Sequence, residues 1–318
     1  MNRIITITIN PALDKSTSVH GIRPHEKLRC EPPVFEPGGG GINVSRALRK
    51  LGSESLAMYL AGGPAGTYLS KMLAQEGVVT KEIAIADWTR ENLAVTDSTN
   101  SQQYRFGMPG PHVQESELGK IHTKLEALLQ KDDILVGSGS LCPGVPIDFY
   151  ANIGDIARKK QAKFILDSSG EPLRSGLGSG VFLLKPNLGE LGFLSGVESV
   201  STANMEAMAI RLIKEKKCKV MVVSMGQRGA LLVTPTEMEY VQAPTVRQKS
   251  TIGAGDSMVA GMVLMLSKGG SYGEMVRYGV ACGTAATMTP GSQLCNKKDV
   301  DNLYDWLLAN RNPKKKIQ

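Results

Sequence analysis

Short apolar runs alternate with amphipathic segments along most of the chain. The apolar runs are rich in β-branched residues and predict strands at Ile4–Ile9, Ile134–Val136, Phe164–Leu166, Val181–Leu184, Val220–Val223 and Leu231–Val233. Between them, apolar positions recur with the helical period at Ile42–Leu51, Glu117–Leu129, Ile147–Arg158 and Met205–Lys214. Alternating strands and helices indicate an α/β fold whose mostly parallel sheet is covered on both faces by helices.

Two polar segments interrupt this alternation. Ser16–Phe35 and Trp88–Met108 carry apolar residues at every second position in places, as at Leu93 and Val95. The pattern predicts antiparallel strands in a small sheet that stands off the main one. We therefore expect one domain over residues 1–318, with a discontinuous lid at about 12–36 and 88–108. Pairing with the lid of a second copy would cover the edges of such a sheet, so a homodimer is expected.

Composition places the chain among globular proteins. It has 318 residues, of which 42% are hydrophobic and 21% charged. The longest nearly apolar stretch, Met258–Leu266, is too short to span a bilayer, and the first residues lack the apolar core of a secretory signal. The five cysteines are scattered without a CxxC pair, which argues against a disulfide scaffold or structural zinc. These features favour a cytoplasmic protein without a membrane partner.

The formal net charge of +7 raises the question of a nucleic-acid partner. Aromatic residues make up only 5% of the chain, and no stacking or recognition-helix motif is present. Part of the excess charge lies in Lys314–Lys316, which we interpret as a solvated tail. Small anionic ligands require positive charge as well, so the sequence favours them over nucleic acid.

Polar and glycine-rich residues follow several of the predicted strands. They are Asp14 after the first strand, then Gly137–Ser140, Asp167–Ser169, Lys185–Asn187 and Ser224–Gly226. In open α/β sheets the ligand crevice lies at the carboxyl ends of the strands. Each group alone could form a turn, but their occurrence after successive strands predicts a binding site.

Thr251–Met258 is the most informative segment, because it carries Gly253-Ala254-Gly255-Asp256 immediately before a predicted helix. Small residues let backbone amides approach an oxyanion, and the helix dipole adds positive potential. The carboxylate of Asp256 has two possible uses there. It either caps the helix, or it accepts the proton of an attacking hydroxyl group.

A second glycine run, Gly38–Gly41, also precedes a helix. It is not a Walker A loop, because no Gly-Lys-Ser/Thr follows at the required spacing, and it lacks the strand–turn–helix setting of a dinucleotide fingerprint. The glycines let the backbone lie flat against a polar ligand. Asn43, just beyond them, can donate to and accept from sugar hydroxyls.

Together, Gly38–Leu51 and Thr251–Gly261 resemble the two signatures of the ribokinase-like (PfkB) carbohydrate kinases. The resemblance extends to about Leu308 and is strongest to the minor bacterial 6-phosphofructokinase type, through segments such as Asp87–Arg90 and Gln103–Phe106. It implies a three-layer α/β/α fold with a lid. The related tagatose-6-phosphate kinases and 1-phosphofructokinases typically carry Lys where this chain has Gly40.

The resemblance implies transfer of a phosphoryl group from ATP to the 1-hydroxyl of fructose 6-phosphate, which is a step of glycolysis. Asp256 would be the base, and the amides of Gly253, Ala254 and Gly255 would form the anion hole. Tagatose 6-phosphate and fructose 1-phosphate are the alternative acceptors. A catalytically silent sugar-phosphate sensor on the same fold is the non-enzyme alternative.

The resemblance also assigns the acceptor site. The sugar would be bound by Asp14, Gly39, Gly40, Asn43 and Ser140, and its phosphate by Lys27, Arg90 and Arg105. From the residues alone, Asp14 can accept hydroxyl hydrogen bonds or form an Asx turn after Pro11. Two arginines on one small sheet suit bidentate binding of a phosphate, although a surface arginine is most often a solvated charge.

The nucleotide side is implied by resemblance as well. ATP would contact Lys185, Asn187, Glu190, Ser224, Gly226, Gly229, Ser250, Val280 and Thr284, and Glu190 would hold Mg²⁺ through water. A monovalent-cation loop, for K⁺, would draw carbonyl oxygens from Ser250, Ile252, Ala286 and Gly291. Thr289 and Gln293 stand where the similar kinases have Asn and Arg.

Overall fold

The computed structural model describes residues 2–291, 293–311 and 315–317, which form two sheets and their covering helices. The main sheet of the described residues has ten strands in the order β14-β13-β12-β11-β10-β9-β8-β1-β4-β5. Seven of them run parallel: β1 (Ile4–Thr8), β4 (Leu56–Ala61), β5 (Val79–Ala84), β8 (Ile134–Ser138), β9 (Lys163–Asp167), β10 (Val181–Leu184) and β11 (Val220–Ser224). The antiparallel strands are β12 (Ala230–Val233), β13 (Glu237–Val241) and β14 (Lys315–Lys316).

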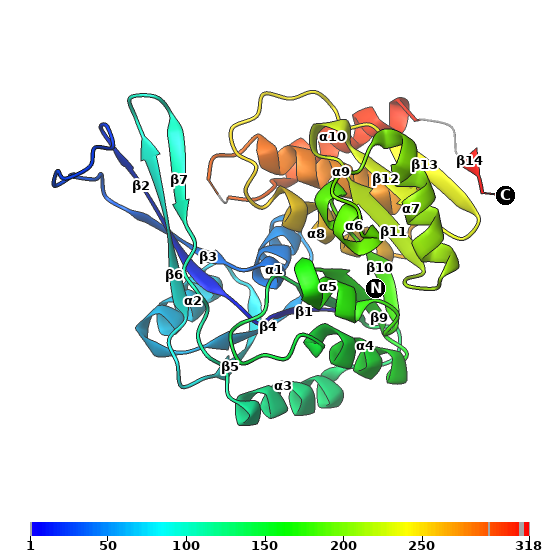
Figure 1. The fold of residues 1–318 in the computed structure, drawn as a ribbon, viewed down its shortest axis with the longest axis horizontal. Coiled ribbons are helices and arrows are strands. Elements are labelled where there is room, and N and C mark those ends of the chain that lie inside the picture. Colours follow the sequence, from blue (N-terminus) through cyan, green and yellow to red (C-terminus); the bar gives the residue numbers. More distant parts are fainter. Residues whose placement is uncertain (1, 292, 312–314, 318) are drawn as a thin grey trace.

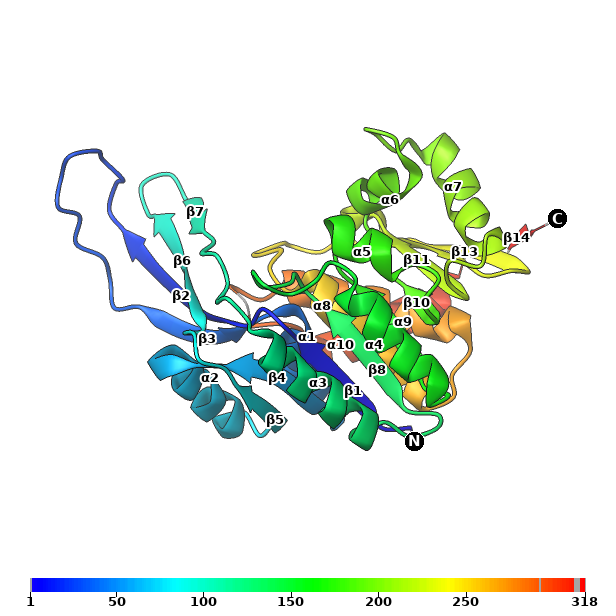
Figure 2. The ribbon, with the colours of Figure 1, turned by 60° about the horizontal axis from the view of Figure 1, so that its bottom comes forward.

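Helices cover both faces of this sheet, as the sequence predicts (Figures 1 and 2). One face carries α1 (Gly40–Lys50), α2 (Gly63–Gln75), α8 (Ala254–Ser267), α9 (Tyr272–Thr287) and α10 (Lys297–Ala309). The other carries α3 (Glu115–Leu128), α4 (Phe149–Lys159), α5 (Gly170–Gly176), α6 (Leu188–Ser195) and α7 (Thr202–Lys214). A single 3₁₀ turn, Gly226–Arg228, joins β11 to β12. The fold is thus a three-layer α/β/α sandwich.

Strand β1 shows how the sequence produces this layering. Ile5 and Ile7 lie in the core beneath α3 and α4, whereas Thr6 points to the opposite face. The Thr6 hydroxyl lies 2.8 Å from Ser45 Oγ on α1 and is fully buried there. The hydroxyl pair satisfies polar atoms that burial would otherwise leave without partners. It therefore anchors α1, which carries the early glycine motif, directly over β1.

The second sheet forms the lid and projects from one side of the molecule (Figure 1). Its strands are β2 (Ala12–Val19), β3 (Val34–Gly38), β6 (Arg90–Asp97) and β7 (Gln102–Phe106), in the order β3-β2-β6-β7. The expected antiparallel pairing holds for β2 with β3 and for β6 with β7, but it is wrong for β2 with β6, which pair in parallel. The reason is that β3 returns the chain to the main body, so β6 leaves it again in the same direction as β2.

The basic tail also differs from expectation. Lys314 lies outside the described residues, whereas Lys315 and Lys316 form β14 at the edge of the main sheet, where Lys316 pairs with Glu237. Both lysines are exposed, so the strand adds backbone pairing rather than core. No helix among the described residues is long and apolar enough to cross a bilayer.

Candidate active site

The chain direction changes between β1 and β8, and the candidate site lies at this point. From β1 the chain builds β4 and β5 on one side, then returns to β8 and continues through β9, β10 and β11 on the other. A reversal of this kind opens a crevice at the carboxyl ends of the two strands. Here Asn10, after β1, donates through Nδ2 to Ser140 Oγ beyond β8, at 3.1 Å.

The early glycine run lies across these two strand ends. A Cβ atom at Gly41 would lie 2.6 Å from Thr8 Oγ1, and one at Gly40 would lie 2.3 Å from Ser138 Oγ and 2.9 Å from the Gly139 nitrogen. Gly39 has a φ of 114° and would place a Cβ 2.7 Å from Thr8. Glycine is therefore required by close approach to β1 and β8, and the run is not a loose turn.

The late glycine motif opens α8, as predicted. Gly253 is the N-cap residue with a φ of 72°, and its cap has no side-chain hydrogen bond. Asp256 lies inside the first turn, so the capping interpretation of this carboxylate is wrong. Its Oδ2 instead accepts a 2.9 Å hydrogen bond from Asn43 Nδ2 on α1. The two glycine motifs thus meet at the half-buried Asp256 carboxylate.

The surroundings of Asp256 favour its protonated form more than water would. The pKa of Asp256 is raised to about 6, mainly by burial and then by the nearby charge of Asp167. The hydrogen bond from Asn43 and the charge of Lys185 act in the opposite direction. A carboxylate with this pKa is well suited to accept a proton near neutral pH.

Lys185 and Asp167 form a buried ion pair beside the start of α8. Lys185 Nζ lies 3.0 Å from Asp167 Oδ1, and the two side chains are 6% and 14% exposed. Burial alone would lower the pKa of Lys185, but Asp167 outweighs it and the net shift is upward. A Cβ on Gly255 would lie 3.7 Å from Nζ, so the ammonium group adjoins the start of α8. It can neutralise a phosphate bound there.

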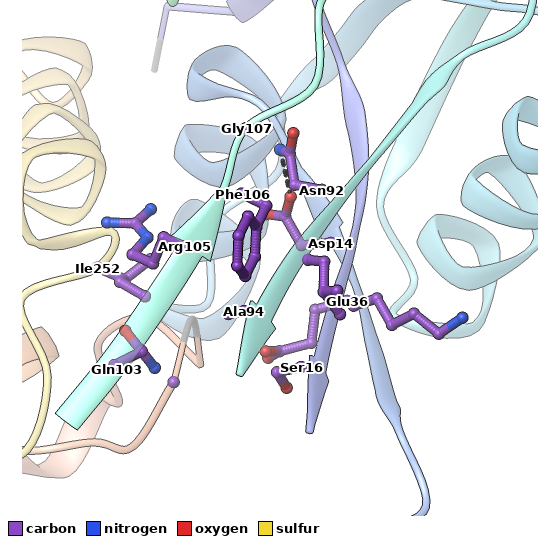
Figure 3. Close-up of a pocket in the computed structure, with 13 residues that line it drawn as sticks. Asp14, Ser16, Glu36, Asn92, Ala94, Gln103, Arg105, Phe106, Gly107 and Ile252 are labelled. Carbon is purple, nitrogen blue, oxygen red and sulfur yellow. Dashed lines mark hydrogen bonds between the residues drawn. The ribbon is translucent and has the colours of Figure 1, made fainter. Parts of the chain in front are cut away.

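A cavity of about 330 Å³ lies under the lid (Figure 3). Its lining includes Asp14, Glu36, Asn92, Arg105 and Ile252. Asp14 and Asn92 are direct partners across β2 and β6, and Asn92 Nδ2 donates to Asp14 Oδ1 at 2.8 Å. Burial raises the pKa of Asp14, while Asn92 and the arginines at 90 and 105 oppose the shift. Asp14 is thus an oriented acceptor that lines the cavity, and its pairing within β2 replaces the alternative of an Asx turn.

The two lid arginines differ in their surroundings. Arg105 is exposed on β7 and lines the cavity beside Ile252 (Figure 3). Arg90 donates at 3.1 Å to the carbonyl oxygens of both Met108 and Asn10, and burial lowers its pKa. The Arg90 Nε atom is buried and has no hydrogen-bond partner among the described residues, and Arg90 does not line this cavity. Lys27 is exposed in the loop between β2 and β3 and does not line this cavity.

The residues predicted to bind nucleotide lie beyond β10, β11 and β13. Asn187 and Glu190 form a reciprocal capping box at the start of α6, so Glu190 does act on the helix terminus. Burial raises the pKa of Glu190. The Ser224 nitrogen donates to Pro186 O at 2.8 Å, which joins these two loops. The remaining predicted residues form the loops and helix face nearby: Gly226 and Gly229 in the turn after β11, Ser250 before α8, and Val280 and Thr284 on α9.

The surroundings of Val280 and of the loop predicted to bind K⁺ can be described in more detail. Val280 is 4% exposed within the core of the α8–α9 layer. In the predicted cation loop, the Thr289 hydroxyl donates to backbone carbonyl oxygens, at 2.8 Å from Ala286 O and 3.0 Å from Leu294 O. Ser250 and Gly291 lie at the two ends of this loop region, and Ile252 and Gly291 both line the lid cavity. Within the described ranges, no group of three or more His, Cys, Asp or Glu residues could hold a metal ion.

Sequence reasoning did not single out Asn92, and it named Asp167 only among the polar residues that follow predicted strands, without a role. Asn92 orients Asp14, and Asp167 pairs with Lys185 and acts on Asp256. Asp167 stands directly at the end of a predicted strand, which was a usable signal. Asn92 alternates with Arg90 on one strand, so the two-residue period could have placed it on the same face.

Comparison with known proteins agrees with this geometry. The pfkB family of carbohydrate kinases matches residues 4–299. The ATP-dependent 6-phosphofructokinase isozyme 2 of Escherichia coli (strain K12) is 42% identical over 308 residues, covering 96% of this chain and 99% of that protein. Its counterpart from Mycobacterium tuberculosis (strain H37Rv) is 42% identical over 303 residues, covering 95% and 89%.

More distant relatives and a solved structure complete the comparison. The 1-phosphofructokinase of Borreliella burgdorferi is 31% identical, covering 94% of this chain and 96% of that protein. The crystal structure of phosphofructokinase-2 from Escherichia coli in complex with potassium superposes with a TM-score of 0.94 at 42% identity. The match covers 97% of this chain and all of that one.

Proposed function

The chain belongs to the pfkB family of carbohydrate kinases, and from this premise we propose that it transfers the γ-phosphoryl group of ATP to the 1-hydroxyl of fructose 6-phosphate. The product would be fructose 1,6-bisphosphate, as in glycolysis. The observation that carries the proposal is the Asp256 carboxylate, which accepts a hydrogen bond from Asn43 in the first turn of α8, directly after the late glycine motif.

In this proposal Asp256 takes the proton of the attacking hydroxyl group. Its raised pKa suits this role, because a base with a pKa near the working pH transfers protons effectively. The amides of Gly253, Ala254 and Gly255 would hold the transferring phosphate at the positive end of α8. Lys185 would neutralise charge on the phosphates. Phosphoryl transfer depends mainly on such positioning and neutralisation.

The acceptor would lie between the glycine run and the lid. Asp14, Asn43 and Ser140 supply polar groups for its hydroxyls, with Gly39 and Gly40 as the flat backbone beneath. Its 6-phosphate would bind to Arg105 and to the unpartnered Nε of Arg90. Lys27 would contribute from a neighbouring copy, since it is exposed away from its own cavity. A sugar without a phosphate would leave these charged side chains unpaired, so the phosphate group would determine which acceptors are bound.

The nucleotide would bind over the loops after β10 and β11. Asn187, Glu190, Ser224, Gly226 and Gly229 would supply the polar surface there, and Ser250, Val280 and Thr284 would contact the nucleotide from the side of α8 and α9. Glu190 would hold Mg²⁺ through water, and the bound ion would neutralise the phosphate charge that develops in transfer. A K⁺ ion would take carbonyl oxygens of Ser250, Ile252, Ala286 and Gly291.

We further propose one kinase domain that dimerises through its lid in the cytoplasm. Exposed apolar side chains on the lid support the dimer, including Val34 at 59% and Phe106 at 48% exposure. The cysteines, at positions 30, 142, 218, 282 and 295, are free thiols, which suits a reducing compartment.

The acceptor is tested by a coupled ADP-release assay across phosphorylated and free ketoses. We expect turnover to be highest with fructose 6-phosphate. If turnover were highest with fructose 1-phosphate or tagatose 6-phosphate, that sugar phosphate would be the substrate instead. Binding of a sugar phosphate without turnover would indicate a sensor. Identity is higher to the 6-phosphofructokinases than to the 1-phosphofructokinase, and Gly40 leaves no room for a Lys side chain.

A further inference from the structure

The Asn43 amide has a defined orientation in the site. Its Nδ2 donates to Asp256 at 2.9 Å, and its Oδ1 accepts from Arg46 Nη1 at 3.4 Å. Arg46 follows Asn43 by one helical turn on α1, so the two side chains share a face. Asn43 is 7% exposed and Arg46 3% exposed, which excludes water as an alternative partner for most of their surfaces.

Arg46 is itself held by three further hydrogen bonds. Its Nε and Nη2 donate to Glu76 at 2.8 and 2.7 Å, in a bidentate pair. Its Nη1 also donates to Pro37 O at 2.8 Å, on the lid strand that leads into the glycine run. Glu76 is the C-cap residue of α2, and its side chain is 31% exposed. The guanidinium group is therefore fixed by α2 and β3 independently of Asn43.

A fixed guanidinium group permits only one orientation of the neighbouring amide. Arginine has donors and no acceptor, so Asn43 must turn its oxygen toward Arg46 and its NH₂ toward Asp256. The flipped amide would place NH₂ against the guanidinium group and its oxygen against the carboxylate. Both contacts would then be repulsive instead of attractive.

We propose that Arg46 and Glu76 are positioning residues for phosphoryl transfer, which act through the Asn43 amide to hold the carboxylate of Asp256 in place as the base. The inference rests on the proposed function, because it concerns the residue that takes the proton. Neither Arg46 nor Glu76 lines the lid cavity, so both would act on the substrate only through other residues.

The charged groups around Asp256 set the expected pH effect. Asp167 from β9 and Asp14 from β2 favour the protonated form, and Lys185 after β10 opposes them together with the Asn43 hydrogen bond from α1. Loss of the Asn43 donor would remove the hydrogen bond that stabilises the deprotonated carboxylate of Asp256, while the charges of Asp167 and Asp14 would remain. The pKa of Asp256 would rise, and the acid limb of the rate profile would move to higher pH.

The test compares Arg46→Lys and Glu76→Gln with wild type in rate–pH profiles with fructose 6-phosphate and ATP. Arg46→Lys keeps the positive charge but removes the guanidinium group that binds Glu76 through two hydrogen bonds. Glu76→Gln changes a partly exposed side chain, so this substitution should disturb folding less. We expect the acid limb to move up by about half a unit or more in Arg46→Lys and by less in Glu76→Gln. A shift of this size should lower kcat of Arg46→Lys about threefold or more at pH values well below the limb.

Asp133→Asn is the matched control, because Arg3 holds Asp133 in the same bidentate manner at 3.0 and 2.6 Å, far from the strand ends of the site. This variant should lose thermal stability without moving the acid limb. A shift of the same size in the control, or an unmoved limb in both test variants, would overturn the proposal.

A double-mutant cycle adds a second readout. If Arg46 acts through Asn43, then Arg46→Lys should have no further effect on kcat in an Asn43→Ala background. If the double variant lost kcat by the product of the two single losses, the proposal would be contradicted. Absence of turnover in wild type would instead refute the proposed function. The Asp256 carboxyl titration, followed by ¹³C NMR and assigned with Asp256→Asn, would then test the positioning directly by the same shift in pKa.

Discussion

Asn43 donates a 2.9 Å hydrogen bond to Asp256 across 213 positions of sequence. This contact joins the helix after the early glycine run to the helix after the late one. Each run alone could be a tight turn, but together they place a carboxylate, an amide and the amides of the α8 N-terminus at one crevice. Catalytic function follows from their convergence.

The pKa of Asp256, about 6, predicts an acid limb in kcat/KM. A base acts in its deprotonated form, so activity should be full above this value and should decline as pH falls through it. Asp167→Asn removes a charge that raises the pKa of Asp256, and its acid limb should move to lower pH. Coupled assays on both sides of the limb measure this. A limb unmoved in the variant would contradict the electrostatic account.

Asn92→Ala tests the orientation of Asp14. The substitution removes the 2.8 Å hydrogen bond that Asp14 accepts, and the pKa of Asp14 should then rise further. A hydrogen bond to a charged group contributes about 1.5–3 kcal/mol, so KM for fructose 6-phosphate should rise roughly tenfold or more. KM for ATP should not change. A larger effect on ATP than on the sugar phosphate would show that Asp14 has another role.

The sequence predicted the strands and helices whose periodicity was undisturbed. The strand predicted at Ile4–Ile9 is found at Ile4–Thr8, where all five residues are buried, and the continuous apolar run Val181–Leu184 is a strand as predicted. It did not predict β4, β5, α2 or α9. The α9 helix, for example, carries Gly273, Gly279 and Gly283, which weaken a helical pattern, and they are tolerated because α9 packs closely on α8 and β13.

The site was predictable where a motif stood at a strand or helix end, as for Asp256 and Lys185. Arg46 and Glu76 could not be found in this way, since they are charged residues in ordinary amphipathic helices. Only the folded structure brings Glu76, at the end of α2, against Arg46. The parallel pairing of β2 with β6 was also beyond a local pattern, because strand direction depends on the path of the chain between them.

Gly40→Ala should damage the crevice. A Cβ there would lie 2.3 Å from Ser138 Oγ and 2.9 Å from the Gly139 backbone nitrogen, and overpacking of this kind costs about 1–3 kcal/mol. We expect a lower Tm and a lower kcat/KM. Adding Ser138→Gly removes the first contact and should recover part of the loss.

Gly119→Ala is the control for this substitution. Nothing lies within 4 Å of its added Cβ, and alanine favours the α3 helix, so Tm should stay or rise. If Gly40→Ala behaved like Gly119→Ala, the close packing of the glycine run against β8 would be wrong.

Arg105→Ala and Arg90→Ala should differ in thermal unfolding. Both should raise KM for fructose 6-phosphate about 10- to 100-fold, since each removes charge-assisted hydrogen bonds to the phosphate. Only Arg90→Ala should also lower Tm, because Met108 O and Asn10 O lose their donor. Unchanged KM in both variants would rule out the phosphate clamp.

The most direct test of the account is Asp256→Asn, measured by calorimetric binding of fructose 6-phosphate and by single-turnover transfer from ATP. The amide keeps the size of the side chain but cannot accept the proton. We predict that sugar-phosphate binding persists within a few-fold, while the transfer rate falls by about 10²–10⁴. A transfer rate close to that of wild type would contradict the assignment of Asp256 as the base.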